Sequence, residues 1–169
     1  MSFKKVTFLF LLAFLFQLSV VNLIEIKNAG PNLVMCMMII ITFLYEDGYR
    51  SIPFGIFFGL LLDICAGPYV GPCALSMFAV GIFAAACHVW LNVEKIITLI
   101  ASAIISTVIY QVAYYGIMKT LGSPMGIEYA AKMLPIYIVY NVIVLVIMFL
   151  VMHKKAEEYH NDRYTNEEV

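Results

Sequence analysis

One acidic residue stands inside the apolar sequence, and small residues precede it at regular intervals. Asp63 ends the run GIFFGLLLD, in which Gly55 and Gly59 come eight and four residues earlier. An ionised carboxylate is expensive in hydrocarbon, so it needs a partner or a role there. Residues four apart share one face of a helix, and glycine lets backbones approach closely. The pattern predicts a helix-packing face that ends in a charge.

The composition defines the surroundings of this acid. The 169 residues are 63% hydrophobic and 12% charged, and the mean hydropathy is +0.94. Such a chain lacks the polar surface that a soluble globule of its size needs. Its apolar runs are continuous rather than alternating, which favours helices over a barrel. The sequence therefore predicts an all-α integral membrane protein.

Hydropathy and turn residues divide the chain into six candidate membrane spans in a compact bundle. They are Val6–Ile24, Leu33–Tyr45, Ile52–Ala66, Cys73–Leu91, Ile96–Met118 and Leu134–Met152. The second and third are short, so five spans with one re-entrant segment stay an alternative. The largest loop, Lys119–Met133, is too small to be a domain. Residues 1–152 are predicted to form one transmembrane domain, and residues 153–169 a short charged cytoplasmic tail.

Basic residues predict the orientation, because Lys and Arg gather on the cytoplasmic side of short loops. With the N-terminus inside, seven of the ten basic residues are cytoplasmic and only Lys27, Lys119 and Lys132 are outside. Both termini are therefore expected in the cytoplasm. The first apolar run is nearer in length to a span than to the core of a signal peptide, and we expect it to be retained.

The depth of each polar residue suggests which side chains can meet. Asp63 is expected near the outer end of its span and His88 near the cytoplasmic face, which disfavours a proton relay between them. Gln17, Gln111 and Asn141 each lie about 10 Å below the outer surface. The four outer side chains, Asp63 and the three amides, could form a polar pocket or a partner contact. Alternatively, each amide hydrogen-bonds a neighbouring helix and does nothing more.

Several functional classes lack support in the sequence. A net charge of −1 without a basic cluster argues against nucleic acid. No hydrolase, protease or phosphate-binding motif is present, and the scattered histidines and cysteines predict neither a metal site nor a cofactor. A disulfide between Cys65 and Cys73, on either side of the Gly/Pro turn, stays open.

The segment GIFFGLLLDICAGPYVGPCALSMFAVG, residues 55–81, resembles the central motif of the rod shape-determining protein MreD family. That motif has a Gly-x-x-x-Gly-Leu-Leu-x-Asp helix, a Gly/Pro turn, a further glycine and a slim helix. Gly55, Gly59, Asp63 and Gly71 occupy its positions, and Gly67 lies in the turn. The family often has a polar or histidine-containing turn after the acid, whereas here Ile-Cys-Ala follows.

The resemblance implies a non-enzymatic subunit of the bacterial elongation machinery in the inner membrane. Family members work with MreC, the actin-like MreB, and RodA with its transpeptidase partner, and the family is thought to share its fold with the substrate-binding subunits of energy-coupling-factor transporters. We expect Asp63 to anchor helix packing through donors such as Gln111, while the single span of MreC docks on the bundle. Lipid surrounds the bundle, and a homodimer stays open.

Two other functions compete with this one. A vitamin-transporter substrate subunit would resemble the same layout, but such subunits typically carry an Ala-x-x-x-Ala face in the first span, where Ala13 is here followed by Gln17. A proton- or ion-coupled transporter using Asp63 would lack a second carboxylate in the membrane and obvious inverted repeats.

Overall fold

The computed structural model describes residues 3–19, 21, 29–45, 47–90, 96–124 and 126–167, without the side chains of residue 90 and of residues 153–167. Within these ranges the chain is all-helical. The elements are α1 (Phe3–Ser19), α3 (Leu33–Leu44), a 3-10 helix η1 (Gly48–Ser51), α4 (Ile52–Ala66), α5 (Pro72–Trp90), α6 (Ile96–Thr120) and α7 (Ile127–Glu167). The prediction of an all-α bundle is confirmed.

Four stretches of the described chain are long and apolar enough to cross a membrane. They are Gly48–Ala66, Pro72–Val89, Ile96–Thr120 and Ile127–Met152. The predicted third span gains its length from η1, which leads directly into α4. By contrast, α3 has only 12 residues, about 18 Å of helix, which is short of the bilayer core. Part of the predicted first span, residue 20 and residues 22–24, lies outside the described residues.

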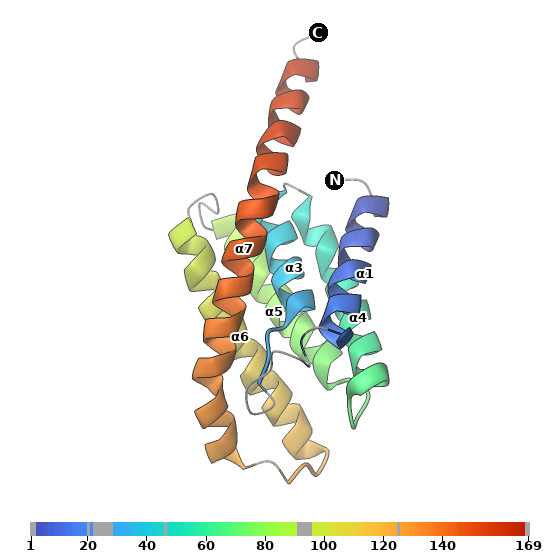
Figure 1. The fold of residues 1–169 in the computed structure, drawn as a ribbon, viewed down its shortest axis with the longest axis vertical. Coiled ribbons are helices and arrows are strands. Elements are labelled where there is room, and N and C mark those ends of the chain that lie inside the picture. Colours follow the sequence, from blue (N-terminus) through green and yellow to red (C-terminus); the bar gives the residue numbers. More distant parts are fainter. Residues whose placement is uncertain are drawn as a thin grey trace.

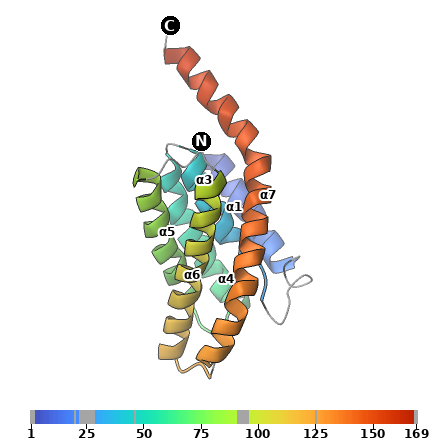
Figure 2. The same ribbon diagram turned by 90° about the vertical axis from the view of Figure 1, so that its left-hand side faces the viewer.

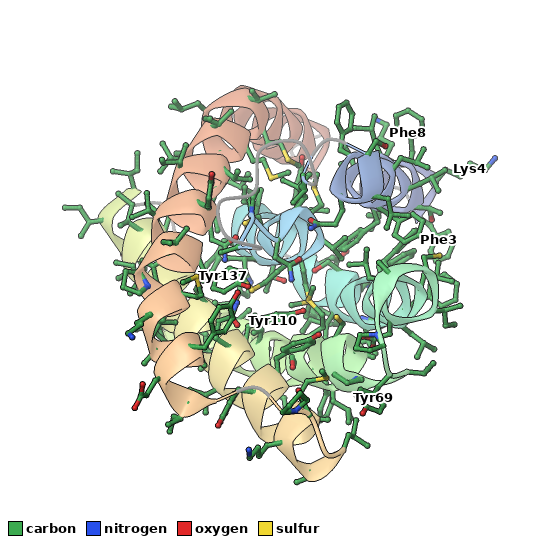
Figure 3. All side chains as sticks on the ribbon, turned by 60° about the horizontal axis from the view of Figure 1, so that its bottom comes forward. Phe3, Lys4, Phe8, Tyr69, Tyr110 and Tyr137 are labelled. Carbon is green, nitrogen blue, oxygen red and sulfur yellow. The ribbon has the colours of Figure 1, made fainter. Side chains whose placement is uncertain are left out.

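Five helices form an open ring around α3. Neighbours in the ring are α1 and α4, α4 and α5, α5 and α6, and α6 and α7, while α3 contacts all five of these helices. Figures 1 and 2 show the roughly parallel and antiparallel packing, and Figure 3 looks into the bundle with α3 near its centre. The short helix is therefore enclosed by longer ones.

The sequence of α3 explains its central place. Ten consecutive residues, Val34–Phe43, are buried, which requires a helix that is apolar on every side. Its sequence LVMCMMIIITFL meets that requirement, with Thr42 as the exception. The Thr42 hydroxyl donates to the carbonyl of Met38, 2.8 Å away, so it too is satisfied inside the bundle.

The start of α1 and the end of α7 lie at the same end of the molecule, as Figure 1 shows. The last helix is longer than the predicted span at each end. It begins at Ile127, not Leu134, and continues to Glu167, so that residues 121–126 alone join it to α6. Glu128 and Lys132 end the apolar run without ending the helix, because a helix can continue past the hydrocarbon. The apolar run therefore predicts the membrane span but does not predict where the helix begins and ends.

Candidate functional site

The Asp63 side chain lies in the last turn of α4 and is buried, with 2% of its surface exposed. Its carboxylate accepts hydrogen bonds from three backbone N–H groups of the following segment. The distances to Oδ2 are 3.0 Å from Gly71, 3.0 Å from Cys73 and 3.3 Å from Ala74, and Oδ1 lies 3.1 Å from the Cys73 nitrogen. The acid therefore holds the first turn of α5.

The sequence at the start of α5 shows why an acceptor must come from another helix. The first N–H groups of a helix have no partner within it, and a side chain just before the helix normally accepts from them. That position is Gly71, which has no side chain, and Pro72 follows with no N–H to satisfy. Asp63 supplies the missing acceptor, and its charge suits the positive end of the α5 dipole.

The turn between the two helices is shaped to present these N–H groups. Gly71 has a φ of +118°, a conformation that glycine adopts far more easily than other residues. Gly67 ends α4, where its N–H donates to the Asp63 carbonyl over 3.0 Å. Cys65 is exposed while Cys73 is partly buried, and both thiols are free. The disulfide that the sequence left open is therefore not formed in this structure.

The two glycines before Asp63, Gly55 and Gly59, lie at close contacts between α4 and its neighbouring helices. A Cβ atom on Gly59 would lie 3.0 Å from Cγ of Met77 and 3.3 Å from Cα of Ala74, both on α5. A Cβ on Gly55 would overlap the side chain of Met38 on α3. The stripe thus lets α4 pack closely against two neighbours, and Asp63 fixes the end of the contact with α5.

Two of the three predicted amides meet at a different place, the start of α3. Gln17 from α1 accepts from the Leu33 N–H over 2.7 Å and donates to the Pro31 carbonyl over 3.0 Å. Asn141 from α7 accepts from the Asn32 N–H over 2.8 Å. The Asn32 side chain itself caps α3 by accepting from the Met35 N–H.

Asn141 also joins this group to α6. Its amide nitrogen donates to the Thr107 hydroxyl over 3.1 Å, and that hydroxyl donates to the Ala103 carbonyl over 2.7 Å. Asn141 and Thr107 are both buried. Side chains of α1, α6 and α7 therefore hold the start of α3 together with its own cap.

The structure does not bring Gln111 and His88 into either group. Gln111 is half-buried on α6, and the donors to Asp63 are backbone amides instead of this side chain. His88 lies in the last turn of α5, which runs antiparallel to α4, so it is at the opposite end of the bundle from Asp63. Residue counting placed the four outer polar residues at one depth, whereas in the structure Asp63 lies at the turn after α4 and the two amides, Gln17 and Asn141, meet at the start of α3.

Tyrosines that the sequence analysis did not single out lie beside Asp63. Tyr110 of α6 is buried close to Cys73, and its ring stacks on that of Tyr114 with centroids 6.0 Å apart. Figure 3 shows Tyr110 and Tyr137 directed into the bundle from α6 and α7. The four-residue spacing of Tyr110 and Tyr114 was the available signal, but α6 is too uniformly apolar to indicate its inner face.

This arrangement suits an anchor. Backbone amides of the α5 segment already occupy both oxygens of the buried carboxylate, which leaves little of it open to a substrate. Among the described residues, no three His, Cys, Asp or Glu side chains are grouped so that they could hold a metal ion. What the geometry provides is a fixed joint between α4 and α5.

Comparison with known proteins gives one match. A family model described as rod shape-determining protein MreD matches residues 1–156 of the 169-residue chain. No curated protein and no solved structure matches. The expected likeness to energy-coupling-factor subunits therefore gains no support and stays a prediction.

Proposed function

This chain belongs to the rod shape-determining protein MreD family, whose model covers residues 1–156, and we propose that it acts by binding MreC in the bacterial inner membrane. Membership makes it a membrane protein that determines cell shape. In our proposal it is a non-enzymatic subunit that organises lateral peptidoglycan synthesis. MreB and RodA with its transpeptidase partner belong to the same assembly, and both termini face the cytoplasm.

The observation that carries the proposal is the joint formed by Asp63. Three backbone N–H groups of the α5 segment depend on this one side chain. The joint supports a mechanism in which a rigid bundle offers its outer surface to the single span of MreC. Since Gly55 and Gly59 already pack against α3 and α5, that span docks elsewhere on the outer surface.

Co-purification of MreC with Asp63 variants tests this function. We expect Asp63→Ala to lower the recovery of MreC and to make rod-shaped cells round, because the start of α5 loses its acceptor. Asp63→Asn keeps an acceptor oxygen and should retain most of both activities. Asp47→Ala, which removes a partly exposed acid next to η1, is the matched control and should change neither.

Two outcomes would contradict the proposal. Unchanged cell shape and MreC recovery in Asp63→Ala would show that the joint serves no assembly role. Loss of function in Asp63→Asn equal to that in Asp63→Ala, at normal protein level and thermal stability, would point to a role for the ionisable group itself, as in an ion-coupled transporter.

A further inference from the structure

The end of the bundle that holds the N-terminus carries exposed cations from two separate elements. Lys4 and Lys5 are exposed on the first turn of α1, and the Arg50 side chain on η1 is 69% exposed. Asp47 lies 3.9 Å from Arg50, but an exposed pair of this kind contributes little and leaves the guanidinium accessible. We call Phe3, Lys4, Lys5, Tyr49 and Arg50 the cationic corner.

A series of aromatic contacts holds α1 beside α4, the helix into which η1 leads. Phe3 and Phe10 both contact Phe54, with ring centroids 5.1 and 5.7 Å apart, and further down Phe10 and Phe14 both contact Phe58 at 5.8 and 5.7 Å. The order of these contacts shows that α1 and α4 run parallel. Arg50 precedes Phe54 by four residues, about one helical turn, so it lies at the same end as Lys4.

The corner also lies at the right depth to meet lipid headgroups. The span Gly48–Ala66 includes η1, which places Arg50 in its first turn. Phe3 and Tyr49 remain 72% and 52% exposed there, as aromatic rings at a membrane interface commonly do. Figure 3 shows Lys4 directed away from the bundle beside Phe3. Positively charged side chains and aromatic rings are therefore exposed together at this end of the bundle.

We propose that the cationic corner binds the headgroup of an anionic glycerophospholipid. The ammonium and guanidinium groups would pair with the phosphate, Arg50 in bidentate fashion. The acyl chains would continue along the outside of α4, where Phe57 and Leu60 are exposed. Glu46 and Asp47 follow α3 in the sequence and offset part of the positive charge at this end of the bundle. The attraction for the phosphate therefore comes from the exposed positions of the cations and not from a large net charge.

The opposite end of the molecule supplies a matched control. Lys119 and Lys132 are exposed near the ends of α6 and α7 that face each other across residues 121–126. Glu128 is exposed on the same hairpin. Neutralising these two lysines removes the same formal charge as neutralising Lys4 and Arg50, but away from the cationic corner.

The test is lipid binding by the purified full chain in zwitterionic phosphatidylcholine nanodiscs to which phosphatidylglycerol is added. Native mass spectrometry counts retained lipid. The double change Lys4→Gln and Arg50→Gln should weaken phosphatidylglycerol retention about 25-fold, since each surface cation contributes about five-fold. The double change Lys119→Gln and Lys132→Gln should leave it within about two-fold. High salt should weaken retention by the unchanged protein.

Three results would overturn the proposal: equal losses in the two double variants, no preference for phosphatidylglycerol over phosphatidylcholine, or displacement of the lipid by millimolar inorganic phosphate, which would indicate a site for free phosphate. The single change Lys4→Gln controls for a folding defect, because the Lys4 side chain is exposed and supports no buried contact. It should still lower retention about five-fold. Retention unchanged in this single variant would also contradict the proposal.

Discussion

Two helices of this bundle begin with help from other helices, and the two starts use different chemistry. At α5 a single carboxylate, Asp63, accepts from three N–H groups. At α3 two neutral amides, Gln17 and Asn141, satisfy the N–H groups of Leu33 and Asn32. Both solve the same problem, the unpaired donors at a helix start inside an apolar protein. The choice between charge and amide is what differs.

Depth in the membrane explains the choice. Asp63 is the fourth residue from the end of the span Gly48–Ala66, and the turn that follows it is exposed. Asn141 lies near the middle of the span Ile127–Met152, about 21 Å along α7 from its start. A charge costs most at the centre of the bilayer and less near its surface. The bundle therefore uses the carboxylate at the edge of one span and the Asn141 amide in the middle of another.

Exchanging the carboxylate and the amide should have the largest effect on stability. Asn141→Asp places a carboxylate near the bilayer centre and should lower the free energy of unfolding by about 3 kcal/mol. Asp63→Asn removes a charge from the edge and should cost only about 1 kcal/mol, the weight of its interaction with the α5 dipole. Unfolding in mixed micelles, followed by circular dichroism, measures both. Equal costs would show that depth does not decide between the two caps.

Removing the acceptor at α5 should have the next largest effect. Asp63→Ala leaves the N–H groups of Gly71, Cys73 and Ala74 without their acceptor and should cost about 2 kcal/mol, as for the loss of a strong helix cap. Hydrogen exchange at these amides should rise first. If exchange stayed slow while stability fell, the loss would lie in packing and not in the cap.

Changing the backbone of the same turn should cost less. Gly71→Ala keeps the carboxylate but forces a side chain onto a residue with φ of +118°, for about 1 kcal/mol. No other atom lies within 4 Å of the added methyl group, so the cost is conformational. Stability measured beside Asp63→Ala separates the contribution of the turn from that of the acid, and an unchanged value would show that the turn adapts.

The smallest effect is expected at one of the paired amides. Gln17→Met keeps the length of the side chain and removes two hydrogen bonds at the start of α3, one to Pro31 and one from Leu33. Interhelical hydrogen bonds in membranes contribute about 0.6 kcal/mol each on average, so the loss of two should cost about 1 kcal/mol, no more than Gly71→Ala. A loss as large as that of Asp63→Ala would mean that the amide and carboxylate caps are equally important.

Counting residues along each predicted helix was enough to predict much of this architecture. It gave an all-α bundle, the bounds of α4, and an acid at the end of α4 far from His88. It did not give the partners, because the rotation of a helix about its axis is hidden when every face is apolar. For that reason Gln111 was grouped with Gln17 and Asn141, and the tyrosines of α6 were overlooked. The glycine and proline at the start of α5 were the one local sign that its cap comes from elsewhere.

The enclosed position of α3 has a consequence for how the chain is made. This helix leaves the ribosome early, whereas α5, α6 and α7, which complete its surroundings, are synthesised later. Asn141, which holds the start of α3, belongs to the last helix. A nascent chain that has not yet reached α7 therefore carries a central helix with one of its caps missing. The bundle can close only when synthesis is nearly finished, and truncation before α7 should expose α3 to the cell's quality-control proteases.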